Sequence, residues 1–127
     1  MGIALDDTRF PLLVARFGAD WTATEFDEYL AWHRDNLRRR KRFAIILDAT
    51  RARSPNALER RKQAEALREG EPLLRQYCAG AAFVIPSSVV RGTLTAILWL
   101  QPPAYESVVV PTFGEADAWV KQRLPTV

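Results

Sequence analysis

Apolar residues along the chain follow two patterns that alternate with each other. Nearly continuous apolar runs occur at Leu12–Phe17, Phe43–Leu47, Ala81–Ile85 and Ser107–Val110. Such runs are typical of strands that are covered on both faces, as in a mainly parallel sheet. A shorter run, Ile3–Leu5, predicts an edge strand that pairs antiparallel with Leu12–Phe17 through a turn at Asp6-Asp7.

Two of the intervening segments begin with the signature of a capping box, a hydroxyl residue followed three positions later by Glu. Thr22 with Glu25 predicts the start of one helix, and Thr112 with Glu115 predicts the start of another. The helical period then places two sets of residues on inward faces. These are Phe26, Leu30, His33 and Leu37 in the first helix, and Ala116, Trp119, Val120 and Leu124 in the last.

Two further helices are predicted between the middle strands. Ser54-Pro55 places a capping residue before a proline at the first helical position, and the helix that follows runs toward Tyr77. The sequence Gly70-Glu-Pro72 is expected to kink or split that helix. Ser87-Ser88 begins a third helix, which Pro102-Pro103 ends.

Strand and helix therefore alternate four times, which predicts an α/β fold with parallel pairing and right-handed crossovers. We expect a mainly parallel sheet of four to five strands, with a short antiparallel N-terminal edge strand and about four flanking helices. The 127 residues fit one domain, residues 1–127, without an internal linker. A chain of this size buries enough surface to fold without a disulfide or a metal.

Composition narrows the class of protein. No apolar run reaches the roughly 18 residues of a transmembrane segment. The first ten residues carry acids where a signal peptide has bases, and the single cysteine, Cys78, fits a reducing compartment. We therefore expect a cytoplasmic protein.

The formal charge of +3 comes from one place. Residues Arg38–Arg42 are five consecutive bases, and without them 13 bases face 15 acids. The run follows a predicted helix, where cations complement the negative end of the helix dipole. A solvated helix end is the favoured interpretation, and a contact with phosphate or an anionic surface is the alternative. Nucleic-acid binding is not favoured, because no aromatic residue inside the run offers a base a stacking partner.

The residue types needed for catalysis are scarce. The chain has one histidine, His33, and one cysteine, and it lacks the GxSxG and HExxH motifs. We expect His33 and Cys78 to be core residues, and we predict no metal site, no cofactor and no enzymatic activity. The segment Gly18–Trp21 does not resemble a phosphate-binding loop. An enzyme that uses Asp48 and His33 remains a weaker alternative.

The loop Asp48–Ser54 is the first candidate site. It follows a buried strand, and ligands of open α/β sheets bind at the carboxyl ends of the strands. Asp48, Arg51 and Arg53 are its candidate binding residues. Plain turn and capping chemistry explains the same residue types, and is favoured over catalysis.

The segment Ser87–Gln101 is the second candidate site, because a helix there has one charge, Arg91, and almost no polar face. Ser87 and Arg91 are positioned to hold an anion at the helix start. The candidate contact residues are Ile97, Leu98, Trp99 and Leu100. A core helix and a surface for a partner or ligand are both open interpretations.

The strings PLLVARF, FAIILDAT, GAAFVIPSS, RGTLTAILWLQPP and FGEADAWVKQRL, in this order, resemble the SpoIIAA-like proteins. These are bacterial relatives of the STAS anti-sigma-factor antagonists and are also compared with the lipid-carrying SEC14 fold. The resemblance implies a small mixed sheet flanked by helices, and a domain that works by binding. It also implies phosphorylation near the DSSG-type motif of the antagonists. The matching stretch here is Asp48-Ala49-Thr50 with Ser54 beyond it, without the tandem serine and the glycine, so Thr50 and Ser54 are the candidate acceptors.

We therefore expect a non-catalytic regulatory or protein-interaction domain, with a protein partner or a second copy of itself in a homodimer. The alternative is a carrier or sensor of a small apolar or anionic-headed, lipid-like ligand. In that case Arg91 would hold the headgroup, and Ile97, Leu98 and Trp99 the tail.

Overall fold

The computed structural model describes residues 2–92, 95 and 103–124. Within them, five strands form one sheet in the order β1-β2-β3-β4-β5. These are β1 (Ile3–Asp6), β2 (Leu12–Phe17), β3 (Phe43–Asp48), β4 (Cys78–Val84) and β5 (Ser107–Val110). The β1–β2 pair is antiparallel and the other three pairs are parallel, which confirms the predicted α/β fold and its antiparallel edge.

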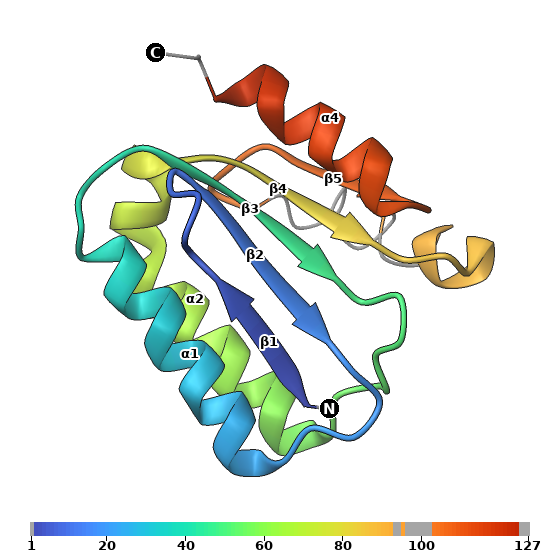
Figure 1. The fold of residues 1–127 in the computed structure, drawn as a ribbon. Coiled ribbons are helices and arrows are strands. Elements are labelled where there is room, and N and C mark those ends of the chain that lie inside the picture. Colours follow the sequence, from blue (N-terminus) through green and yellow to red (C-terminus); the bar gives the residue numbers. More distant parts are fainter. Residues whose placement is uncertain (1, 93–94, 96–102, 125–127) are drawn as a thin grey trace.

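Helices cover both faces of the sheet (Figure 1). The helices α1 (Ala23–Leu37) and α2 (Ala57–Tyr77) lie side by side on one face, and α4 (Phe113–Arg123) lies on the other. Residues 88–92 are also helical. No helix in the described part of the chain is both long and apolar enough to cross a membrane.

Alternate residues of the central strands β2 and β3 enter cores on opposite faces of the sheet, because successive side chains of a strand point to opposite faces. Val14 and Ile46 pack beneath α4, together with Val120 of that helix. Leu13 and Ile45 pack on the opposite face against α1 and α2. Apolar residues are therefore needed at consecutive positions, which explains the continuous runs in the sequence.

The start of α2 differs from the prediction. Asn56, not Ser54, caps this helix, and Asn56 forms a complete capping box with Glu59. Asn and Ser are comparable N-cap residues, but the residue three positions after Ser54 is Ala57. Its methyl side chain cannot accept the hydrogen bond that completes a capping box. Thr22 and Thr112 cap α1 and α4 as predicted.

The helix α2 is not split at Gly70–Pro72, which was one of the two outcomes predicted for this segment. The helix runs without interruption from Ala57 to Tyr77, with Pro72 inside it. Proline removes one backbone donor, yet side chains on both sides of it, Leu67 and Leu74, pack against the sheet. Tertiary packing therefore holds the helix together across Pro72. The strand β4 then begins at Cys78, three residues before the predicted start.

Residues Arg38–Arg42 follow the end of α1 and are exposed. The Arg39 guanidinium lies 4.2 Å from the centroid of the Phe10 ring, and its Nη2 lies 3.5 Å from Asp7 Oδ2. Arg40 adopts a φ of 53°, which turns the chain from α1 toward β3. This arrangement matches the predicted helix end, with each cation in or near solvent.

Candidate functional site

A pocket lies at the carboxyl ends of β2 and β3. Its volume is about 290 Å³, and it is lined by Ala4, Arg16, Phe17, Gly18, Asp48, Thr50 and Arg51. On this face the helix α4 packs over β3, β4 and β5, and within the described residues it does not extend over β1 (Figure 1). The pocket thus lies at the sheet edge where α/β folds place their ligands, as the sequence predicted for the loop after β3.

Arg16 is the single polar residue of β2, and its side chain lies on the face of the sheet that α4 covers. The parallel register places it opposite Asp48 at the end of β3. Arg16 Nε lies 3.7 Å from Asp48 Oδ2, and the guanidinium lies 4.7 Å from the centroid of the Phe113 ring. The ring at the start of α4 therefore supports the flat guanidinium, and about half of the Arg16 side chain stays exposed.

Asp48 organises the loop that follows β3. Its Oδ1 accepts hydrogen bonds from the backbone N of Thr50 at 3.0 Å and from Thr50 Oγ1 at 2.5 Å. This is the arrangement in which an aspartate closes a turn on its own backbone two residues later. The turn chemistry expected for Asp48 is therefore present, and it sets the position of Thr50 at the pocket wall.

Arg51 is the most available charged group of the pocket. Its side chain is exposed, and within the described residues it has no hydrogen-bond or ion-pair partner. Since Arg16 and Asp48 already contact each other, Arg51 contributes positive charge that no carboxylate among the described residues pairs with.

Arg53 lies on the same loop but is not part of the pocket lining. Its Nη1 and Nη2 donate to the two carboxylate oxygens of Glu59 at 2.9 Å, and Nη2 also donates to the Trp21 carbonyl at 3.1 Å. Glu59 is buried, and its Oε2 accepts from Trp21 Nε1 at 2.9 Å. This cluster connects the loop after β3 to the loop after β2. Arg53 therefore helps to position the residues of the pocket without lining it.

Ser54 is exposed and does not begin α2. Its carbonyl accepts a hydrogen bond from Arg53 Nη1 at 3.1 Å. Of the two candidate phosphate acceptors, Thr50 therefore lines the pocket and Ser54 lies beyond it.

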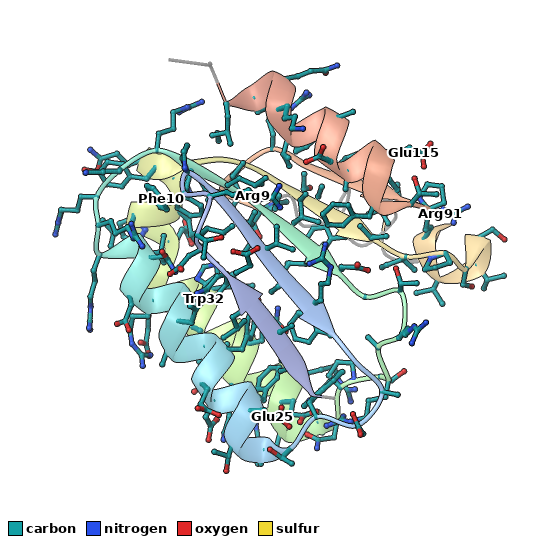
Figure 2. The ribbon with its side chains drawn as sticks, viewed as in Figure 1. Arg9, Phe10, Glu25, Trp32, Arg91 and Glu115 are labelled. Carbon is teal, nitrogen blue, oxygen red and sulfur yellow. The ribbon has the colours of Figure 1, made fainter. Side chains whose placement is uncertain are left out.

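The second candidate segment lies past the end of β4, where Figure 2 labels Arg91. Ser87 caps the helical residues 88–92, since its Oγ accepts from the Val90 backbone N at 3.3 Å. Arg91 Nη1 donates to the carbonyls of Ile85 and Pro86, at 2.9 and 2.6 Å. The predicted contact residues Ile97, Leu98, Trp99 and Leu100 lie outside the described residues.

The two side chains best suited to acid–base or nucleophilic work lie on the other face of the sheet. His33 is on α1 with its ring 6.3 Å from that of Tyr29, and burial lowers its pKa to about 4. Cys78 is buried, and burial raises the pKa of its thiol to about 11. Asp48 faces α4 through Arg16 and Phe113, so the sheet separates it from His33 and the two do not form a catalytic pair.

The described residues also contain no group of three or more His, Cys, Asp or Glu placed to hold a metal ion. Comparisons of the chain with protein-family models, with curated proteins and with solved structures found no match. The chemistry of the site therefore has to be judged from the pocket itself, which offers charge, hydrogen-bond donors and shape for binding.

The sequence indicated the pocket residues in the loop after β3 but not those at the end of β2. Asp48, Thr50 and Arg51 were identified, whereas Arg16 and Gly18 were not. The available signal was Arg16, the single charge in the strand LLVARF, since a charge in a covered strand needs either a partner or solvent. The role of Glu59 had no such signal, because it lies in an ordinary run of charged helical residues.

Proposed function

We propose that this chain is a non-catalytic regulatory domain of the SpoIIAA-like, STAS-related type, which binds a protein partner in the bacterial cytoplasm. The contact surface is the sheet edge formed by the loop Asp48–Ser54 and the ends of β2 and β3. The observation that carries the proposal is the distribution of polar groups. Arg16, Asp48 and Arg51 gather at one edge of the sheet, while on the far face Cys78 is buried and His33 is half-buried.

The family assignment rests on the resemblance in sequence, and the mixed sheet with its antiparallel edge pair is compatible with it. Under this proposal Thr50 is the acceptor best placed to control binding. A phosphoryl group on Thr50 Oγ1 would replace its hydrogen bond to Asp48 and add a charge of about −2 at the pocket wall. The same surface would then present a different charge to the partner.

Site-specific photocrosslinking in cells of the source organism tests the contact surface. p-Benzoylphenylalanine replaces Arg51 in one variant and Arg61 in a matched control, since Arg61 is an exposed arginine on α2. We expect a discrete crosslinked product from position 51 that is absent from position 61 and is reduced by Thr50→Glu. A product of twice the 14.4 kDa chain mass would identify the partner as a second copy.

The proposal fails if position 51 yields no product, or if positions 51 and 61 yield the same products. Circular dichroism of each variant checks that the fold is intact. Arg51 is a suitable position for the probe because its side chain has no partner within the described residues, so its replacement removes no contact there.

A further inference from the structure

The pocket at the ends of β2 and β3 holds two guanidinium groups and one carboxylate. Arg16 and Arg51 line it together with Asp48, so its side chains carry a net charge of +1. A pocket with unbalanced positive charge attracts anions, and planar guanidinium groups match the oxygens of carboxylate and phosphate. We propose that this pocket binds a small oxyanion, a carboxylate or a phosphate, between the guanidinium groups of Arg16 and Arg51.

The carboxylate in the pocket is already engaged, which reduces its repulsion of an anion. Asp48 Oδ1 accepts two hydrogen bonds from Thr50, and Oδ2 faces Arg16 Nε at 3.7 Å. Asp48 therefore acts on the ligand through Arg16, whose orientation it sets jointly with the ring of Phe113.

Donors remain free for a ligand. In the described part of the chain, Arg16 has one carboxylate contact, through Nε, and no other hydrogen bond or ion pair of its side chain. The Arg51 side chain has no hydrogen bond or ion pair with any of the described residues. The Nη groups of Arg16 and the whole guanidinium of Arg51 are thus available to donate hydrogen bonds to the oxygens of an anion.

Size limits what the rest of the ligand can be. A volume of about 290 Å³ is just below the usual range of ligand pockets, which is roughly 300–1,000 Å³. Ala4 and Phe17 supply apolar lining next to the two arginines. The pocket therefore accommodates an oxyanion on a short carbon skeleton. This inference stands on the pocket alone and does not depend on the protein partner proposed above.

Titration of the ¹⁵N-labelled protein with inorganic phosphate, and separately with acetate, tests the inference. Both are added at constant ionic strength against sodium chloride. We expect saturable shifts of the backbone amide signals of Gly18, Thr50 and Arg51 with at least one of the two anions, and no saturation with chloride. The anion that saturates at lower concentration identifies the preferred class of oxyanion.

Three variants make the test specific. Arg51→Gln should weaken binding at least about tenfold, because it removes charged hydrogen bonds to the ligand. Arg16→Lys keeps the positive charge beside Asp48 but removes the paired N–H donors of the guanidinium group. This variant should weaken binding as well. Arg61→Gln removes the same charge from the exposed surface of α2 and should bind like the unaltered protein.

Shifts that rise linearly with both anions, or equal binding by the Arg51→Gln variant and the unaltered protein, would overturn the inference. Equal weakening by Arg61→Gln would do the same, since it would show a response to overall charge. If position 51 yields no crosslinked product but the protein binds an anion saturably, the proposed protein partner is refuted and the oxyanion site is supported. Retained crosslinking without saturable anion binding would refute the oxyanion site alone.

Discussion

The buried carboxylate of Glu59 should be one of the strongest single contributors to stability near the candidate site. It accepts hydrogen bonds from Arg53 Nη1 and Nη2 and from Trp21 Nε1 at 2.9 Å, and from the Asn56 backbone N at 3.0 Å. Glu59→Gln keeps the shape of the side chain, removes its charge and turns one acceptor oxygen into a donor. Two donors are then left facing an amide NH₂ group.

The expected loss follows from the burial of the group. Removing one member of a fully buried ion pair costs about 3–5 kcal/mol, and charged hydrogen bonds contribute about 1.5–3 kcal/mol each. About a third of the Arg53 side chain is exposed, so water compensates part of its lost interaction. We therefore expect Glu59→Gln to lower the free energy of unfolding by about 2 kcal/mol. Glu65→Gln, at an exposed position of the same helix, is the matched control and should stay within about 0.5 kcal/mol of the unaltered protein.

Acid provides an independent check. The hydrogen bonds from the Arg53 side chain, above all, lower the pKa of Glu59 from 4.5 to about 2. Between these two values the unfolded chain binds a proton that the folded chain does not, so falling pH removes the stability that Glu59 contributes. The free energy of unfolding in urea should therefore differ most between the unaltered protein and Glu59→Gln at pH 7. At pH 3.5 the difference between these two proteins should be smaller. A difference below about 0.5 kcal/mol at pH 7, or one that does not change with pH, would refute the reasoning.

Three other predictions concern the core. Gly80→Ala should lower the free energy of unfolding in urea by about 1–3 kcal/mol, since an added Cβ would lie 2.7 Å from the Trp119 ring. Gly114→Ala is the control and should not lower it, because an added Cβ there would have no atom within 4 Å. Equal effects of the two substitutions would contradict this explanation. Cys78 should react with iodoacetamide at pH 7.5 roughly a hundredfold more slowly in the folded protein than in urea, because its pKa is raised to about 11, and comparable rates would contradict its burial. The NMR titration of His33 should have a midpoint near pH 4, and its contribution to stability should be lost as the pH falls from 6.5 toward 4; a midpoint near 6.5 would show that the ring is not buried.

The sequence by itself was sufficient for the elements and their class. The bounds of β2 and β5 agree with the predicted runs, Leu12–Phe17 and Ser107–Val110. The capping residues Thr22 and Thr112 are also where the sequence placed them. These features depend on neighbours within a few residues, or on a strand being apolar on both faces, and a linear pattern records both.

Local rules failed where long-range packing outweighed them. Pro72 favours a break in α2, but burial of side chains on both sides of it keeps the helix continuous. The fourth strand was predicted to begin at Ala81, whereas β4 begins at Cys78, because pairing with Phe43 draws the chain into the sheet at that point. In both cases the deciding contacts are with residues that are distant in the sequence.

The candidate site shows the same division. The loop after β3 was identified from the sequence, because its position follows from the topology of α/β sheets. The second wall of the pocket comes from β2, and only the register that sets Arg16 opposite Asp48 brings the two together. The roles of the two loop arginines were likewise decided in three dimensions. Arg53 lies against Trp21 and Glu59 while Arg51 lines the pocket, since the availability of a charge depends on which side chains the fold places around it.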